Sequence, residues 1–459
     1  MHFAQIYVPG VAHCSYVIGS GDKCVVVDPA RNISPYLDKA DSFGMEIVGV
    51  LETHLHADFI SGHMDLAEET GAKIYAPEIA HCDFPHTALK EGDEFTIDKL
   101  KFQLLETPGH TPDCSVYVVT DLERGQDPVM VFTGDTLLVG SVGRPDLFPD
   151  QEEKLAENLF DSLKKLKNLP DHVEVYPAHG MGSLCGRALS AKLSSTIGLE
   201  RKQNFTFKHT DLHAFKQDIL TDMPPAPDHF ARCTEINRQG PTQVRQLNAP
   251  QPLNVPDVKA AVDSWNVILD TRPYLSFASG HIPGSYSIST EGNLPTFAGW
   301  IIPPEAGITL VLEREEDLAQ VTKALYTVGL DDITGYLEGG VVPWIHAGEK
   351  ADHIHPVSID EIKSYIESSE SLVLDNRAKS EWQEGHIKGT TLAPTPDVRH
   401  MYKEWDTEQP VVTFCNTSNR SMTAASILKQ KGFKNVANFL GGTTAWKAAG
   451  FEFESQEED

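Results

Sequence analysis

The sequence predicts an α/β protein that is built from about three domains. Short runs rich in Val, Ile and Phe alternate with turns and with amphipathic stretches of helical period. The chain has 459 residues, which is too long for one ordinary hydrophobic core. Its second half contains the same short motifs twice in the same order. These observations together predict one larger α/β domain followed by two smaller, homologous ones.

The composition is typical of a soluble globular protein, with 40% hydrophobic and 23% charged residues. The formal net charge of -28 disfavours nucleic acid and anionic membranes as partners, and we expect neither. No apolar run is long enough for a transmembrane helix, and the N-terminal residues do not resemble a secretory signal. The seven cysteines show no pairing pattern, which predicts reduced thiols and a cytoplasmic location.

The first domain, expected over residues 1–240, is predicted to alternate strands with turns and helices. The predicted strands are Lys23–Asp28, Ile47–Leu51, Lys73–Ala76, Phe102–Glu106, Ser115–Val119 and Val129–Phe132. The predicted helices are Asp65–Thr70, Asp150–Leu166 and Arg187–Gln203. In the second helix, four leucines at spacings of three or four residues form one apolar face.

One turn in this domain, Thr53–Gly62, concentrates residues that bind metal ions. It contains His54, His56 and Asp58 and follows an apolar strand. Imidazole and carboxylate ligands together suit Zn, Fe or Mn. Phe59 places an apolar ring where a further ligand could lie. The turn therefore predicts a metal site.

Three later loops carry a His or Asp directly after an apolar strand. Glycine and proline next to these residues permit tight turns. The three segments are Pro108-Gly109-His110-Thr111, Gly134-Asp135 and Pro177-Ala178-His179. Each polar side chain is therefore predicted to stand at the C-terminal end of a strand.

A polar stretch rich in Gln and Pro, Arg238–Pro256, predicts the end of the first domain. The remainder contains an internal repeat, and we expect its copies over residues 256–350 and 356–455. The anchors are Asp270, Arg272, His281, Gly339, Gly340 and Trp344 in one copy and Asp375, Arg377, His386, Gly441, Gly442 and Trp446 in the other. Each copy is predicted to begin with a buried strand and to end at a Gly-Gly turn before a helix.

Cys415 follows the apolar run Val411–Phe414 in a short loop that leads into a helical stretch. Backbone N–H groups of such a loop, the helix dipole and Arg420 would favour a thiolate. A buried structural cysteine is the alternative, which we assign to Cys24 and Cys114. The loop context favours a reactive thiolate at Cys415.

The ordered motifs of the first domain resemble the metallo-β-lactamase superfamily. They are His-x-His-x-Asp, Pro-Gly-His-Thr, Gly-Asp and Pro-Ala-His. Within that superfamily, Thr53–Asp58, Gly134–Leu138 and Val142–Phe148 resemble the persulfide dioxygenases, which are mononuclear non-haem iron enzymes. The resemblance implies an αββα sandwich that holds one Fe(II).

The same resemblance implies that His54, His110 and Asp135 ligate the iron and leave three octahedral positions open. His56, Asp58 and His179 would then orient ligands or water. The dinuclear zinc hydrolases of this fold carry a His directly after the motif Asp, where this chain has Phe59, although some dioxygenases of the family retain that His. Phe59 therefore argues for one metal ion.

The segment Cys415–Ser421, with the upstream Asp-x-Arg and Gly-His-Ile motifs, resembles rhodanese, which carries sulfur as a persulfide on this Cys. The predicted fold class is thus a metallo-β-lactamase αββα sandwich followed by two rhodanese-like α/β domains. The middle copy has the acidic segment Ile308–Leu318 and no Cys, so it looks degenerate. It could act as a spacer, a docking surface or a lid.

The resemblance implies sulfide and persulfide oxidation, as in hydrogen sulfide detoxification. A low-molecular-weight thiol persulfide would be oxidised by O2 to sulfite and thiol. Cys415, with Arg420, would exchange sulfur among sulfite, persulfide and thiosulfate, in a direction that the sequence leaves open. The thiol could be glutathione, coenzyme A, cysteine or another. Arg144 could pair with an anionic substrate group, or it could form a surface ion pair.

Two other functions are compatible with the motifs. One is a zinc-dependent, glyoxalase II-like thioester hydrolase with a fused sulfur-carrier domain. The other is a protein that binds or senses sulfur without catalysis. Phe59 and the rhodanese-like region disfavour the hydrolase, and the intact ligand set disfavours the sensor. We also expect a homo-oligomer.

Overall fold

The computed structural model describes residues 1–454 apart from 188, 222, 265 and 369. The chain divides into two compact units. The first comprises Met1–Leu247 and the short segment Tyr326–Gly329, and the second comprises the remainder. No helix in the described ranges is both long and apolar enough to cross a membrane.

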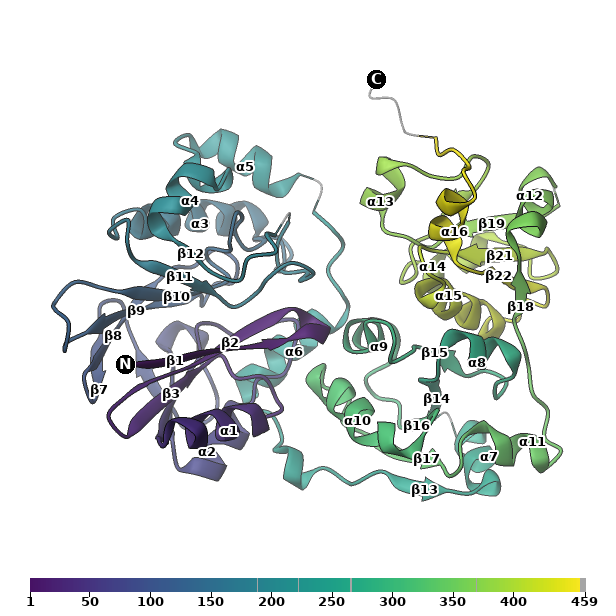
Figure 1. The fold of residues 1–459 in the computed structure, drawn as a ribbon, viewed down its shortest axis with the longest axis horizontal. Coiled ribbons are helices and arrows are strands. Elements are labelled where there is room, and N and C mark those ends of the chain that lie inside the picture. Colours follow the sequence, from purple (N-terminus) through teal and green to yellow (C-terminus); the bar gives the residue numbers. More distant parts are fainter. Residues whose placement is uncertain (188, 222, 265, 369, 455–459) are drawn as a thin grey trace. The chain divides into compact units, whose positions relative to one another are not determined.

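The first unit is a sandwich of two six-stranded sheets, seen edge-on in Figure 1. The first sheet has the order β1-β2-β3-β4-β5-β6, with β1 (His2–Val8), β2 (His13–Ser20), β3 (Lys23–Val27), β4 (Glu46–Leu51), β5 (Lys73–Pro77) and β6 (Thr87–Leu89). The second has the order β12-β11-β10-β9-β8-β7, with β7 (Glu94–Ile97), β8 (Leu100–Glu106), β9 (Ser115–Asp121), β10 (Met130–Gly134), β11 (Glu174–Pro177) and β12 (Ser195–Thr196).

Helices cover the outer face of each sheet. They are α1 (Ser34–Phe43), α2 (His63–Thr70), α3 (Glu152–Leu166), α4 (Ile197–Gln203) and α5 (Leu212–Leu220). A further helix, α6 (His229–Gln239), packs on the loop after β4, where Asn237 donates hydrogen bonds to the His56 and Phe59 carbonyls (2.9 and 2.8 Å). The core between the sheets joins Val27 and Leu51 of the first sheet to Phe102 and Phe132 of the second. A separate cluster packs the leucine face of α3 on the outside of the second sheet. The predicted αββα layering is therefore confirmed.

The predicted strands of the first domain are present with small changes at their ends, and α2 and α3 match two of the predicted helices. The helix predicted over Arg187–Gln203 is wrong in its first half. Of the described residues in this range, only Ile197–Gln203 are helical, and β12 precedes them directly; residue 188 lies outside the described residues. The backbone carbonyl of Arg187 accepts a hydrogen bond from Ser141 Oγ (2.6 Å). The Arg187 guanidinium binds Asp218 (2.7 Å) and the Thr221 carbonyl (2.8 Å). The Ser141 hydroxyl thus takes the carbonyl that a helix would use, and the side-chain contacts anchor Arg187 to distant residues.

The second unit contains two five-stranded parallel sheets with the same topology. The order is β13-β17-β16-β14-β15 in the first and β18-β22-β21-β19-β20 in the second. The first sheet and its helices are β13 (Gln251–Leu253), α7 (Val255–Asp263), β14 (Val267–Asp270), α8 (Tyr274–Ser279), β15 (Tyr286–Ser287), α9 (Leu294–Ile301), β16 (Ile308–Val311), α10 (Leu318–Thr327), β17 (Ile333–Leu337) and α11 (Val341–His346). The second set is β18 (His355–Val357), α12 (Ile359–Glu367), β19 (Leu372–Asp375), α13 (Lys379–Glu384), β20 (Thr391–Leu392), α14 (Val398–Met401), β21 (Val411–Phe414), α15 (Asn419–Gln430), β22 (Val436–Phe439) and α16 (Gly442–Ala448).

Candidate metal centre and cysteine loop

Three side chains converge at the C-terminal ends of strands in the sandwich. His54 lies just beyond β4, His110 lies in the loop between β8 and β9, and Asp135 directly follows β10. Asp135 Oδ2 lies 3.3 Å from His110 Nε2 and 3.9 Å from His54 Nε2. All three side chains are buried, and their candidate ligand atoms lie within 4.8 Å of one another. This geometry could hold one metal ion.

The other ring nitrogen of each histidine is already hydrogen-bonded. His54 Nδ1 donates to Thr53 Oγ1 (2.9 Å), and that hydroxyl donates to Asp28 Oδ2 (2.9 Å). His110 Nδ1 donates to the backbone carbonyl of Arg144 (2.8 Å). Neither Nε2 atom has a hydrogen-bond partner among the described residues. Each imidazole thus directs an unshared nitrogen lone pair towards Asp135, which fits a metal ion.

The protonation states also suit metal binding. Burial lowers the pKa of His54 and of His110, so both rings are neutral near pH 7. Burial acts against ionisation of Asp135, but the nearby His179, His110 and His54 hold its pKa well below its usual range. Two neutral imidazoles and one carboxylate are therefore available as ligands.

His179 lies between two carboxylates. Its Nδ1 donates to Asp135 Oδ1 (2.8 Å), and its Nε2 lies 2.9 Å from Asp58 Oδ2. Burial disfavours the charged ring, but the two carboxylates raise the pKa of His179 well above its usual value. A protonated His179 has no lone pair for a metal ion, so its contacts are those of a residue that holds Asp135 in place. Cys185 Sγ lies close to Asp58 and His179, and the sequence analysis assigned it no role.

His56 faces away from the three converging atoms, towards a different pair of carboxylates. Its Nε2 lies 3.3 Å from Asp28 Oδ1 and 4.0 Å from Glu52 Oε2. The buried ring of Phe59 packs between His13 and His56, with centroid distances of 4.2 and 4.4 Å. An apolar ring therefore fills the space beside the centre where the sequence pattern would admit another ligand.

Arg144 is 1% exposed. Its guanidinium binds both carboxylate oxygens of Asp146 (2.7 and 2.8 Å) and donates to the Leu184 carbonyl (3.2 Å). The guanidinium is thus occupied within the protein, and pairing with a substrate stays a prediction. The backbone carbonyl of Arg144 orients His110, a role that its side-chain type does not indicate.

The cysteine loop of the last domain joins β21 to α15. Cys415 is buried directly after β21, and its carbonyl accepts a hydrogen bond from the Thr443 backbone N–H (2.9 Å). A Cβ atom at Gly442, where φ is +45°, would lie 1.8 Å from that carbonyl oxygen. The Gly-Gly turn of the repeat is thus required for α16 to approach the loop this closely.

Glu381, on α13, holds the same loop in place through hydrogen bonds. It was not among the predicted site residues. Its carboxylate accepts hydrogen bonds from Arg420 (2.6 and 2.9 Å) and from Asn416 Nδ2 (2.8 Å). Burial would raise the pKa of Glu381, but Arg420 and Asn416 lower it to about 2. Its position four residues after the Asp-x-Arg motif is the sequence signal that could have found it. Arg420 therefore reaches the loop with its charge already paired.

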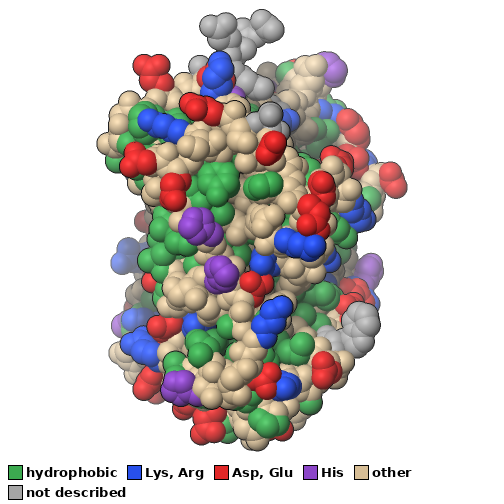
Figure 2. Space-filling model, turned by 90° about the vertical axis from the view of Figure 1, so that its right-hand side faces the viewer, with side chains coloured by type: hydrophobic (Ala, Val, Ile, Leu, Met, Phe, Trp, Pro, Cys, Tyr) green, Lys and Arg blue, Asp and Glu red, His purple; other side chains and the backbone are tan. Residues whose placement is uncertain are grey.

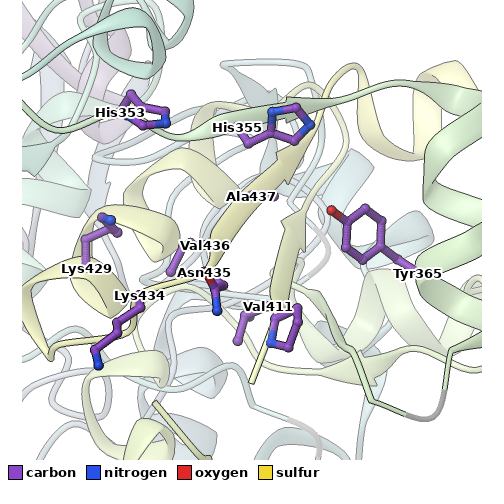
Figure 3. Close-up of a pocket in the computed structure, with 10 residues that line it drawn as sticks. His353, His355, Tyr365, Val411, Lys429, Lys434, Asn435, Val436 and Ala437 are labelled. Atoms are coloured by element: carbon purple, nitrogen blue, oxygen red, sulfur yellow. The ribbon is translucent and has the colours of Figure 1, made fainter. Parts of the chain in front are cut away.

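A cavity of about 240 Å³ lies at the opposite end of this domain's sheet. Figure 3 shows His353, His355 and Tyr365 around the first residues of β21 and β22. Its two lysines are already paired, Lys429 with Asp352 (3.0 Å) and Lys434 with Glu408 (2.7 Å). The cavity therefore offers little net positive charge to an anion.

Residues 8–179 match the metallo-beta-lactamase superfamily, and residues 254–347 and 358–449 match the rhodanese-like domain. The crystal structure of a metallo-beta-lactamase from Staphylococcus aureus subsp. aureus COL is 31% identical. It covers 73% of this chain and 98% of its own, with a TM-score of 0.66. The chain belongs to the metallo-beta-lactamase superfamily. More particularly, it is a member in which two rhodanese-like domains follow the metallo-beta-lactamase domain.

Curated relatives match the first part of the chain. The probable polyketide biosynthesis zinc-dependent hydrolase BaeB of Bacillus velezensis is 29% identical over 220 residues, 45% of this chain and 90% of the relative. A hydroxyacylglutathione hydrolase of Methylococcus capsulatus is 35% identical over 163 residues, 35% of this chain. The chain spans only 58% of that second relative's length.

Proposed function

We propose that this protein is a non-haem Fe(II) persulfide dioxygenase fused to a sulfurtransferase. The first activity would be RSSH + O2 + H2O → RSH + SO3²⁻ + 2 H⁺. The observation that carries the proposal is the convergence of two unpartnered His Nε2 atoms on the Asp135 carboxylate. Phe59, in place of a further His, supports one metal ion. The rhodanese-like cysteine loop in the same chain supports sulfur as the substrate atom.

His54, His110 and Asp135 would hold the metal ion. Fe(II) in a two-His, one-carboxylate set supplies adjacent open positions for O2 and a sulfur ligand. The protein's own residues keep the ligands in place. Thr53 fixes the His54 tautomer, and the Nδ1–H of His179 holds Asp135. Because every one of these side chains is buried, bulk water is largely kept from the reacting groups.

Cys415 would carry the second activity. Its thiolate attacks the outer sulfur of RSSH, which breaks the S–S bond and releases RS⁻. Sulfite then attacks the outer sulfur of the Cys415 persulfide, and thiosulfate, a proton and the Cys415 thiolate are formed. The reverse sequence uses the same groups. Glu381 and Arg420 keep the loop in the shape that presents Cys415.

The test combines metal analysis with an oxygen electrode and a panel of persulfides of glutathione, coenzyme A and cysteine. We expect one iron per chain and O2 consumption with at least one persulfide. His110→Ala should lose both iron and O2 uptake, and preserved uptake would sink the ligand assignment. Cys415→Ser should keep O2 uptake and accumulate sulfite in place of thiosulfate.

A zinc-dependent thioester hydrolase is the second candidate. The similarity to BaeB and to the hydroxyacylglutathione hydrolase favours it. In that case His54, His110 and Asp135 would hold zinc, which would supply Lewis-acid activation of water for thioester cleavage. His179 would keep Asp135 in place. Zinc in the purified protein, thioester cleavage and no O2 uptake would establish this function and exclude the dioxygenase.

A further inference from the structure

The middle domain keeps the backbone of a rhodanese-like cysteine site but not its chemistry. In the two sheets, Asp270 pairs with Val311, and Asp375 pairs with Phe414. Because the registers are the same, Leu312 occupies the position of Cys415. Gly340 approaches the Leu312 carbonyl in the way that Gly442 approaches the Cys415 carbonyl.

The Asp–Arg ion pair that borders the site is also retained. Arg272 binds Asp270 (2.6 Å) and the Gly280 carbonyl (2.8 Å). In the last domain, Arg377 makes the same contacts with Asp375 (2.7 Å) and the Gly385 carbonyl (2.9 Å). The Arg272 guanidinium is therefore committed to the fold and does not serve as an anion receptor.

This scaffold encloses a cavity of about 370 Å³. It is lined by residues of α8, of the loop after β16 and of α11, among them Ser276, Leu312, Glu313, Val342 and Ile345. A second cavity of about 310 Å³ shares Leu312, Glu313, Gly339 and Gly340 with the first. Its lining also includes Arg314, Glu315 and Glu316. The lining therefore combines the buried Leu312 with an acidic wall of Glu313, Glu315 and Glu316. Its two arginines, Arg272 and Arg314, are each paired with an aspartate.

The acidic wall replaces the neutral side chains of the active loop. Glu313 and Glu316 stand where the last domain has Asn416 and Asn419. Among the described residues, neither carboxylate has an ion pair, whereas Arg314 pairs with Asp317 (3.0 Å). The charge of the site therefore favours a cation and repels a persulfide or sulfite.

The rim of the cavity carries large apolar side chains that reach solvent. Val342 and Ile345, which line the cavity, are 52% and 48% exposed. Figure 2 shows one face of the molecule, on which hydrophobic side chains reach the surface beside acidic ones. An apolar rim that extends beyond the cavity suits a ligand larger than one side chain.

We propose that this cavity is a docking site for a segment of a partner protein that carries an Arg or Lys next to large apolar residues. The cationic group lies against Glu313 and Glu316. The neighbouring apolar side chains cover Val342 and Ile345. Charge complementarity and the exposed apolar rim select this occupant, and the loss of the cysteine leaves the site free for binding alone.

The probe is a capped, fluorescent pentapeptide of alternating leucine and arginine, titrated into the full-length protein at low salt. A peptide with glutamate in place of arginine is the matched control. Glu313→Gln with Glu316→Gln should weaken binding about five- to tenfold and reduce its salt dependence. Val342→Ala with Ile345→Ala should weaken binding and leave the salt dependence unchanged.

Asp263→Asn with Glu305→Gln is the charge-matched control variant, because both residues are exposed in the same domain and neither lines the cavity. It should bind the arginine peptide as the wild type does. Equal binding of both peptides, equal weakening by the control variant, or no binding by the wild type at millimolar peptide would each overturn the proposal. All variants should keep the Cys415 activity, since none of the substituted residues belongs to that site.

Discussion

Thr53→Val tests whether the hydroxyl of Thr53 sets up the metal centre. The hydroxyl bridges His54 Nδ1 and Asp28 Oδ2, both at 2.9 Å, and all three residues are buried. Valine has nearly the same shape, so packing is kept and only the two hydrogen bonds are lost. An unsatisfied buried polar group costs about 1–3 kcal/mol, so the metal-free protein should lose roughly 2–4 kcal/mol of unfolding free energy.

The effect on the metal should be specific. Without its acceptor, the His54 ring no longer favours the tautomer that leaves Nε2 unprotonated, and metal affinity should fall about 10–100-fold. Competition with a chelator measures the affinity, and denaturant unfolding of the metal-free protein measures the stability. Thr53→Ser retains the hydroxyl and should restore most of both. Wild-type affinity in Thr53→Val, or the same loss in Thr53→Ser, would refute the role assigned to the hydroxyl.

Three further substitutions test other parts of the site. Cys415→Ala should abolish thiosulfate formation, measured by product analysis, and leave metal content unchanged. Phe59→His provides the further ligand, so metal analysis should find more than one ion per chain, and an unchanged ratio would contradict the blocking role of Phe59. Because the pKa of Glu381 is lowered from 4.5 to about 2, its pairing stabilises the fold above pH 4.5, and this stability is lost as the pH falls towards 2. Glu381→Gln should therefore flatten that part of the pH–stability curve by about 1 kcal/mol after solvent screening, and an unaltered curve would argue against this role of Glu381.

The metal centre could be predicted as far as its position in the fold. Val-rich strands are easy to recognise in a sequence. A polar residue directly after such a strand, as at Asp135, must lie at the C-terminal end of that strand. The partners of the second ring nitrogens could not be predicted in the same way. The Arg144 carbonyl that receives His110 is a backbone atom, and its place depends on the whole path of the loop. Asp28 reaches Thr53 only because β3 and β4 are neighbours.

The same distinction explains the error at Arg187–Gln203 and the surroundings of Arg144. Apolar spacing predicted a helix over the whole of Arg187–Gln203, but Ser141 and Asp218, distant in sequence, hold its first part in an irregular path. Arg144 was considered as a substrate ligand or as one member of a surface ion pair. Its buried guanidinium forms an ion pair with Asp146, and binding of a substrate by Arg144 stays a prediction. Local pattern does not determine either outcome.

The two rhodanese-like domains share one fold but differ in the charge of the loop that follows the central strand. In the last domain, Glu381 stands four residues after Arg377 and pairs with Arg420, so the loop around Cys415 is close to neutral. In the middle domain, Ser276 takes the position of Glu381, and Asp317 takes that of Arg420. The last domain thus has its carboxylate on the supporting helix, and the middle domain has one in the loop itself, where it would repel a persulfide. Leu312 has no thiol that could carry a persulfide, and the acidic loop repels an anionic sulfur species, so both differences disfavour sulfur transfer in the middle domain.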